Sequence, residues 1–268
     1  MGEKLFSKKV FPPTQLMICG LDLGSRSVKL VVLNEETKQI TDAKIFETIK
    51  FYKEYASLQD GVLQVDLEAL GYGSVAQVVA TGYGRNTINV QGAKIIPELK
   101  AHTLGAVWQT GLLDFTLLDL GGQDSKIIKV RGGKMADFLT NDKCAASTGR
   151  YLENMAAVLG LSLAELADYT ENPVELNATC AIFGESELIG RIVEGYDPAA
   201  MAAGVNYSIF KRIKPLLLKL LSETIVLTGG VAKGRAISAF VAQELNAAVV
   251  IPKEPQLNGA IGCAVFAL

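Results

Sequence analysis

The chain has 268 residues, of which 49% are hydrophobic and 20% are charged, and its formal net charge is −2. This composition supports a sizeable core and excludes a largely disordered protein. The near-neutral charge gives no reason to expect a nucleic-acid partner. No segment reaches the about eighteen unbroken apolar residues of a membrane helix, and residues 1–15 lack the apolar core of a secretory signal. We therefore expect a cytoplasmic protein with no membrane partner.

Strands and helices are expected to alternate after a loose arm over residues 1–16. Short apolar runs bounded by turn residues predict strands over 16–21, 28–33, 78–81, 115–118, 125–130, 224–228 and 248–251. Longer segments predict helices over 97–109, 146–160, 162–169, 182–194, 198–221 (with possible breaks), 232–245 and 258–266. This alternation predicts an α/β fold.

A turn of the form Asp-Leu-Gly between two apolar runs occurs twice. The matched residues are Asp22/Asp119, Leu23/Leu120, Gly24/Gly121 and Lys29/Lys126. The distance between the copies is that of a whole lobe rather than of a short repeat. The repeat predicts two homologous α/β lobes, over residues 17–110 and 111–268, each opening with a hairpin that faces phosphate. The last helix is a candidate to return to the first lobe.

The two turns have the chemistry of an anion site. Glycine permits positive φ and lets backbone N–H groups approach a phosphate closely. An aspartate at a strand end can hold a hydrated magnesium ion. Ordinary hairpins favour the same residues, so one such turn alone is weak support. Two matched copies strengthen the prediction, and further polar contacts are offered by Ser25, Ser27, Gln123 and Ser125.

A third turn adds to this prediction. The strand expected over 225–228 runs into Gly229-Gly230-Val231-Ala232-Lys233, and a helix follows. A strand, a glycine pair and a helix N-terminus make a suitable seat for a nucleotide. Taken alone, this turn would be interpreted as free of ligand. Together with the two hairpins it predicts a nucleotide site.

Four segments carry a resemblance to a known family: Thr81–Arg85, Leu118–Lys126, Asn141–Arg150 and Gly229–Lys233. They resemble the activator (component A) of 2-hydroxyacyl-CoA dehydratases, a family that includes the ATPase subunits of benzoyl-CoA reductase. The resemblance runs from about residue 18 to the C-terminus, and Asn141–Arg150 is its most specific part. It implies duplicated actin/Hsp70/sugar-kinase-like (ribonuclease H-like) lobes around a nucleotide cleft.

The resemblance and the turn chemistry together predict ATP and Mg²⁺ contacts. Asp22, Asp119 and Gln123 are the predicted catalytic residues: the aspartates would organise magnesium and the attacking water, with Gln123 near the γ-phosphate. The other predicted contacts are Gly24, Ser25, Arg26, Ser27, Val28, Gly121 and Gly122 for phosphate, and Gly229, Gly230, Lys233 and Gln256 for the nucleoside. Two residues depart from the family pattern: Arg26 stands where threonine is more usual, and Ser147 where glycine is usual.

Two cysteines, Cys144 and Cys180, are each expected to lead into a helix. A helix N-terminus favours thiolate over thiol and also favours an anionic cluster. Two thiolates do not complete a 4Fe–4S cluster, which usually takes about four. One symmetric solution is a homodimer that shares one cluster, as the resemblance also implies. The alternative is a pair of buried free cysteines, but the Asn141-Asp-Lys-Cys context favours the cluster.

The remaining cysteines, Cys19 and Cys263, lie in apolar segments and are expected in the core. The only histidine, His102, lies four residues after Glu98 on an expected helix and is interpreted as structural or interfacial.

The resemblance implies an ATPase that drives one low-potential electron into a partner. That partner would be an iron–sulfur dehydratase or an aromatic-ring reductase, and the electron donor would be a protein such as ferredoxin or flavodoxin. Two alternatives from other classes remain. One is a small-molecule kinase of the same superfamily, and the other is an actin-like or chaperone-like switch with slow turnover and no cluster.

Overall fold

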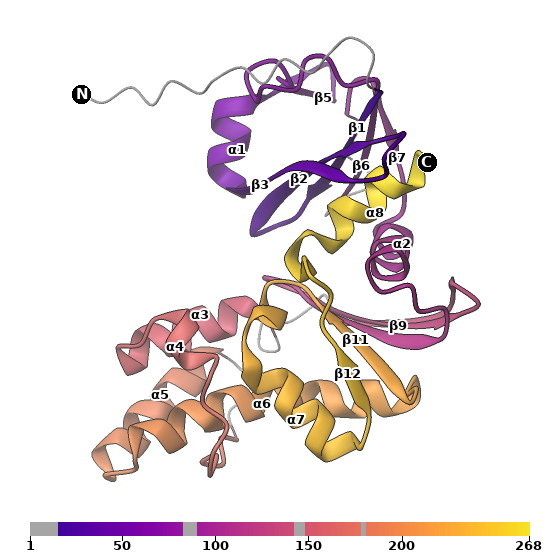
Figure 1. Ribbon diagram of the computed structural model, residues 1–268. Helices are drawn as coiled ribbons and strands as arrows, with labels where there is room; N and C mark the ends of the chain where they lie inside the picture. Colours follow the sequence, from indigo (N-terminus) through magenta and orange to yellow (C-terminus); the bar gives the residue numbers. More distant parts are fainter. Residues whose placement is uncertain (1–15, 83–89, 142–147, 178–180) are drawn as a thin grey trace. The chain divides into compact units, whose positions relative to one another are not determined.

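The structure is a computed structural model that describes residues 16–82, 90–141, 148–177 and 181–268 (Figure 1). The expected arm over residues 1–16 lies outside this part of the chain, except for Leu16. The chain forms two compact units. The first comprises the chain up to Gly105 together with Gly259–Leu268, and the second comprises Ala106–Asn258. The chain leaves the first unit within α2 (Glu98–Thr110) and returns to it at the start of α8 (Asn258–Phe266).

The first unit contains a five-stranded sheet in the order β3-β2-β1-β6-β7. Strand β1 is antiparallel to β2 and parallel to β6. Every residue of β1 is buried, so this strand forms the middle of the unit's core. The strands are β1 (Met17–Leu23), β2 (Ser27–Asn34), β3 (Ile40–Glu47), β6 (Gln77–Gly82) and β7 (Ala93–Ile95). Helix α1 (Thr48–Tyr55) and a two-stranded hairpin of β4 (Ala56–Gln59) and β5 (Val62–Val65) follow β3.

The second unit repeats this sheet topology. Its five strands run in the order β10-β9-β8-β11-β12, and β8 is antiparallel to β9 and parallel to β11. The strands are β8 (Phe115–Leu120), β9 (Ser125–Arg131), β10 (Lys134–Asn141), β11 (Thr224–Thr228) and β12 (Ala248–Val250). The predicted α/β fold is therefore confirmed, and the repeat seen in the sequence extends to the strand order.

Five helices of the second unit differ in part from their predicted bounds. They are α3 (Gly149–Leu159), α4 (Leu163–Leu166), α5 (Ala181–Val193), α6 (Pro198–Lys219) and α7 (Arg235–Leu245). Helix α6 is continuous although it contains Pro215, so the possible breaks are absent. The helix expected over 232–245 begins only at Arg235, after a short 3₁₀ turn over Val231–Lys233.

The helix expected over 162–169 is reduced to α4 because neighbouring groups take its backbone carbonyls. The Asn206 side-chain amide donates to the carbonyls of Leu166 and Tyr169. The Ala167 carbonyl accepts from the Ala236 N–H at 2.9 Å. These carbonyls hold α4 against α6 and α7 rather than continuing the helix.

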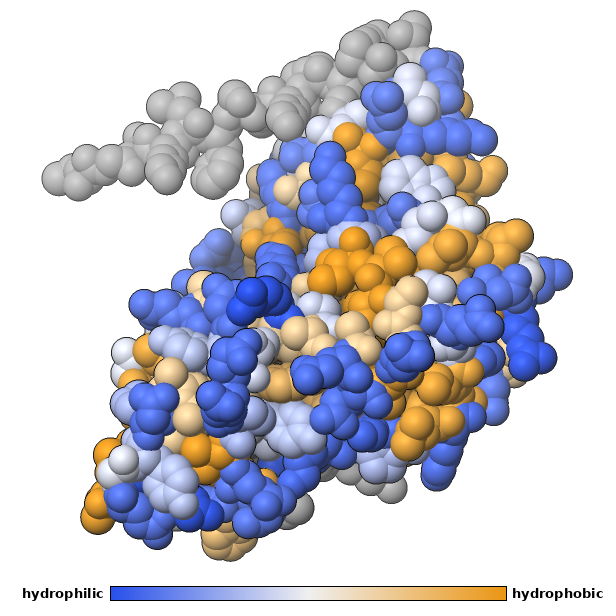
Figure 2. All heavy atoms as spheres, turned by 60° about the horizontal axis from the view of Figure 1, so that its bottom comes forward, coloured by the Kyte–Doolittle hydropathy of each residue, from blue (hydrophilic) through white to orange (hydrophobic). Residues whose placement is uncertain are grey.

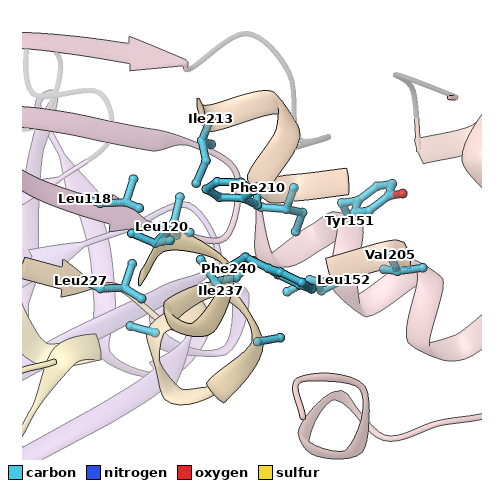
Figure 3. Packing of buried hydrophobic residues seen from close by; sticks show 14 of the residues in the cluster. Leu118, Leu120, Tyr151, Leu152, Val205, Phe210, Ile213, Leu227, Ile237 and Phe240 are labelled. Atoms are coloured by element: carbon cyan, nitrogen blue, oxygen red, sulfur yellow. The ribbon is translucent and has the colours of Figure 1, made fainter. Parts of the chain in front are cut away.

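The core of the second unit lies between its sheet and helices α3, α6 and α7 (Figure 3). Leu118, Leu120 and Leu227 project from the strands toward the helices. The helix side chains labelled in the figure are Tyr151, Leu152, Val205, Phe210, Ile213, Ile237 and Phe240. Tyr151 is fully buried and its hydroxyl lies 3.1 Å from Ser208 Oγ. Helix α3 is thus anchored to the same strands that carry the second Asp-Leu-Gly turn.

In the first unit, the backbone of helix α8 lies directly against the backbones of β1 and α2. Glycines at the contact points have no side chain to separate them. A Cβ on Gly20 of β1 would lie 2.0 Å from the Ala260 carbonyl oxygen, and one on Gly262 would lie 1.7 Å from that of Ala101. Such distances are far shorter than any real Cβ contact. Strand β1, α2 and α8 are therefore fixed tightly to one another.

Hydrophilic and hydrophobic side chains are interspersed on the face drawn in Figure 2. Within the described part of the chain, α5 carries several exposed apolar side chains: Phe183, Ile189, Ile192 and Val193. None of the helices in the described ranges is long and apolar enough to span a membrane.

Candidate nucleotide site

The first Asp-Leu-Gly turn joins the end of β1 to the start of β2. Asp22 is 3% exposed, and Lys29 lies opposite it on β2 with its Nζ 3.2 Å from Asp22 Oδ2. A Cβ on Gly24 would lie 2.8 Å from the same Nζ, so the ammonium lies directly beside the turn. This places positive charge beside a glycine turn, which suits an anion.

The second turn repeats this pairing with one difference. Asp119 on β8 is 2% exposed and lies opposite Lys126 on β9. Here Nζ is 3.8 Å from Asp119 Oδ2 but only 2.6 Å from Asp124 Oδ2. Thr228 Oγ1, from β11, donates a 2.7 Å hydrogen bond to Asp119 Oδ1. The Asp119 carboxylate is therefore held in one orientation by groups from two neighbouring strands.

The third turn follows β11 and approaches the second turn closely. Gly229 has φ of 89°, and a Cβ there would lie 2.1 Å from the Leu120 carbonyl oxygen. Its N–H donates to the Pro255 carbonyl at 2.9 Å, which brings the 3₁₀ turn over Pro255–Leu257 beside it. A Cβ on Gly230 would lie 3.6 Å from Gln256 Nε2.

The second unit therefore brings together a large part of the predicted site. These residues are Asp119, Gly121, Gly122, Gln123, Gly229, Gly230, Lys233 and Gln256. Gln123 and Lys233 are exposed to solvent. The residues predicted around the first turn, Asp22 and Gly24–Val28, belong to the first unit. Val28 is buried in its core, which leaves only its backbone for a ligand.

Three polar residues beside the turns had no predicted role. Lys29 and Lys126 contact the two buried aspartates, and Thr228 fixes one of them. The lysines carried a signal, because they are matched in the repeat. Thr228 begins the third glycine turn, but its contact with Asp119 was not predicted, since it depends on the parallel pairing of β8 with β11.

The predicted cluster ligands Cys144 and Cys180 lie outside the described residues, as does Ser147. The other two cysteines are buried, which confirms that they are core residues. Burial raises the pKa of Cys19 to about 12, and it also raises the pKa of Cys263. The His102 Nε2 lies 3.9 Å from Glu98 Oε1 inside the first unit. Among the described residues, no three His, Cys, Asp or Glu side chains converge as metal ligands.

The two sheets of identical strand order match the actin/MreB/sugar-kinase-like ATPase fold. Within that class the chain belongs to the BadF/BadG/BcrA/BcrD ATPase family, which matches residues 19–267. The family resemblance predicted from the motifs is thereby confirmed.

Two relatives are similar over almost their whole length. The 2-hydroxyisocaproyl-CoA dehydratase activator of Clostridioides difficile is 36% identical over 264 residues, covering 92% of this chain and 93% of that protein. The (R)-2-hydroxyglutaryl-CoA dehydratase activating ATPase of Acidaminococcus fermentans is 31% identical, covering 92% and 95%. A solved structure of the activator of the 2-hydroxyisocaproyl-CoA dehydratase from Clostridium difficile with bound ADPNP superposes with a TM-score of 0.79 at 31% identity. That superposition covers 95% of this chain and 94% of the other.

Proposed function

We propose that this chain is a cytoplasmic, ATP-dependent electron-transfer activator of a 2-hydroxyacyl-CoA dehydratase. The observation that carries the proposal is the buried Asp119 carboxylate, oriented by Thr228 and Lys126 at the end of β8. An oriented carboxylate beside two glycine turns suits a magnesium nucleotide. Similarity to activating ATPases over more than nine-tenths of the chain supports the choice of partner.

We assign the phosphate contacts to both Asp-Leu-Gly turns. In the first, Gly24, Ser25, Arg26 and Ser27 offer backbone N–H groups, hydroxyls and a guanidinium, and Val28 offers its backbone. In the second, Gly121 and Gly122 offer backbone groups and Gln123 an exposed amide. The nucleoside is assigned to Gly229, Gly230, Lys233 and Gln256, since Gln256 lies beside Gly230.

Hydrolysis requires a water oxygen to bond the γ-phosphorus while the bond to the bridging oxygen of ADP breaks. Asp22 and Asp119 are assigned to the magnesium ion and the attacking water. The proton of this water passes to a phosphate oxygen of the product as the bond forms. Lys29 and Lys126 offset the charge of these carboxylates until the metal nucleotide binds. Positioning and electrostatic stabilisation are the main contributions a protein makes to this reaction.

We assign Cys144 and Cys180 as thiolate ligands of one 4Fe–4S cluster per homodimer. Bound there, the cluster would supply one-electron transfer. Cys180 directly precedes Ala181, where α5 begins, and Cys144 precedes the start of α3 by five residues. At Cys180, which adjoins its helix in the sequence, the partial positive charge of the N-terminus favours a thiolate and an anionic cluster.

The dimer is supported by the exposed apolar side chains of α5. Phe183 is 70% exposed and Val193 is 83% exposed. Contiguous exposed apolar surface commonly marks a protein–protein contact. A homodimer would supply four cysteines, which is about the number a 4Fe–4S cluster usually takes.

ATP provides enough free energy for the proposed electron transfer. A shift of about 200 mV in a one-electron potential corresponds to roughly 5 kcal/mol, since about 59 mV corresponds to 1.4 kcal/mol. The proposed electron donor is a ferredoxin or flavodoxin, and the proposed acceptor is an iron–sulfur dehydratase.

The test is anaerobic purification followed by measurement of iron, acid-labile sulfide, subunit mass and ATPase activity. We expect about four irons per dimer, loss of colour in air and Mg²⁺-dependent ATP hydrolysis. Activation of a dehydratase, with none of a benzoyl-CoA-type reductase, would settle the partner. A colourless, iron-free protein that phosphorylates a small molecule would instead be a kinase of the same superfamily.

A further inference from the structure

Helix α3 is capped by the second Asp-Leu-Gly turn instead of by its own residues. The first N–H groups of an α-helix have no partner within the helix. The side chain of Thr148, which precedes α3, makes no capping hydrogen bond. The Gly149 N–H donates to the Gly121 carbonyl at 2.9 Å, and the Arg150 N–H donates to the Gly122 carbonyl at 3.0 Å. Two backbone hydrogen bonds therefore join α3 to the turn.

These bonds also fix the direction of the N–H groups on the opposite side of the turn. In a planar trans peptide unit, the C=O and the N–H point in opposite directions. The carbonyls of Gly121 and Gly122 share their peptide units with the N–H groups of Gly122 and Gln123. Both N–H groups consequently point away from α3, and neither donates to a backbone carbonyl of the described residues.

The first unit contains a related arrangement. Thr48, the first residue of α1, donates its Oγ1 to the Gly24 carbonyl at 2.7 Å and its N–H to the Arg26 carbonyl at 3.4 Å. Thus the carbonyls of each turn are held by the first residues of a helix from the same unit. The donors differ, because a hydroxyl replaces one of the backbone N–H groups in the first unit.

We propose that the first turns of α3 and α1 are positioning elements for the two phosphate turns. They orient the backbone N–H donors before the nucleotide arrives, so binding an anion requires no backbone rearrangement. The effect is reciprocal, because an anion on one side of a peptide unit polarises it and strengthens the hydrogen bond on the other. Nucleotide binding therefore stabilises the start of α3. This inference rests on the proposed nucleotide site.

Gly149 permits a direct test of the contact with the turn. Proline is well tolerated at the first position of a helix but has no N–H. Thr148 already has the extended backbone that a following proline requires, with φ of −136° and ψ of 175°. Gly149→Pro thus removes the donor to Gly121, and its ring also displaces the Gly121 carbonyl oxygen, which lies 2.9 Å from the Gly149 nitrogen. Gly149→Ala is the matched control, because its Cβ meets nothing nearer than the Gly121 oxygen at 3.4 Å and its N–H remains.

We expect Gly149→Pro to raise the dissociation constant of the full-length protein for magnesium ADP about tenfold, the effect of one lost hydrogen bond. Gly149→Ala should stay within about twofold of wild type, as ordinary surface substitutions do. The nucleotide affinity should change more than the turnover number at saturation. Equal affinities for the two variants and wild type overturn the inference.

Two further experiments test the inference if Gly149→Pro does not fold. One uses substitutions of Thr48, and the other measures amide hydrogen exchange in the wild-type protein. Thr48→Val removes the hydroxyl that contacts Gly24 and should weaken magnesium ADP binding, whereas Thr48→Ser should restore it. In wild type, magnesium ADP should slow amide exchange in the first turn of α3 and leave its last turn unchanged. Unchanged exchange at the first turn, in a protein that binds magnesium ADP, contradicts the inference. If the wild-type protein binds no nucleotide, both the proposed function and this inference are contradicted.

Discussion

The Thr228 hydroxyl and the Asp119 carboxylate form a 2.7 Å hydrogen bond between the ends of two parallel strands. Both residues are buried, and they are separated by 109 positions in the chain. Lys126 approaches the other carboxylate oxygen at 3.8 Å. A buried carboxylate that accepts a hydrogen bond on one oxygen and lies beside an ammonium on the other keeps one orientation, which is the property a magnesium or water ligand requires.

Removing this hydroxyl should impair hydrolysis. Thr228→Val keeps the shape of the side chain but leaves a buried carboxylate oxygen without its donor, which costs about 1.5–3 kcal/mol. We expect the turnover number for ATP to fall at least about tenfold, measured by phosphate release at saturating magnesium. Thr228→Ser retains the hydroxyl and should keep most of the activity. Equal activity of the valine and serine variants would show that Asp119 does not depend on Thr228.

Asp124 should tune the magnesium requirement. It holds the Lys126 ammonium at 2.6 Å, so this group stays 3.8 Å from Asp119. Asp124→Asn weakens that pairing and frees the ammonium to move toward Asp119, where it competes with Mg²⁺. We expect the Mg²⁺ concentration for half-maximal ATPase activity to rise several-fold.

The matched control for this change is Asp137→Asn. Asp137 lies on the exposed strand β10, and the contact of its Oδ1 is with the N–H of its own neighbour, Phe138. This substitution removes the same charge and should leave the Mg²⁺ titration unchanged. A shift common to both variants would mean that net charge, not the Lys126 contact, controls the titration.

The two glycines of the third turn should respond very differently to alanine. Gly229 has φ of 89°, and its Cβ would lie 2.1 Å from a backbone oxygen of β8. Gly229→Ala should destabilise the protein by at least about 2 kcal/mol, because neither the strain nor the clash can be relieved by a side chain. Gly230→Ala places its Cβ 3.6 Å from the flexible end of Gln256 and should change stability little. The melting temperatures of the two variants, measured with and without nucleotide, test this prediction. Equal melting temperatures for Gly229→Ala and Gly230→Ala would contradict it.

The strands and turns that carry the site could be predicted because their signal is local. Apolar runs, Asp-Leu-Gly turns and their repetition all lie within short windows of sequence. Strands β3 and β10 were not predicted, since they are largely exposed and rich in polar residues. The contact between Thr228 and Asp119 was also beyond prediction, because it depends on which distant strands pair. The shortening of α4 likewise depends on Asn206, forty residues away from Leu166.

The cysteines provide the sharpest test of the proposed cluster, because the chain contains its own controls. A ligand must be a thiolate, and burial raises the pKa of Cys19 to about 12 and holds that of Cys263 above its usual range. Both of these thiols therefore stay protonated at neutral pH. Cys144→Ser and Cys180→Ser should each lose most of the iron of the anaerobically purified protein, whereas Cys263→Ala should retain it. Because each chain supplies both proposed ligands, a single substitution removes two of about four thiolates from the shared cluster. Full iron in either serine variant would exclude that residue as a ligand, and iron loss only in Cys263→Ala would place the cluster elsewhere.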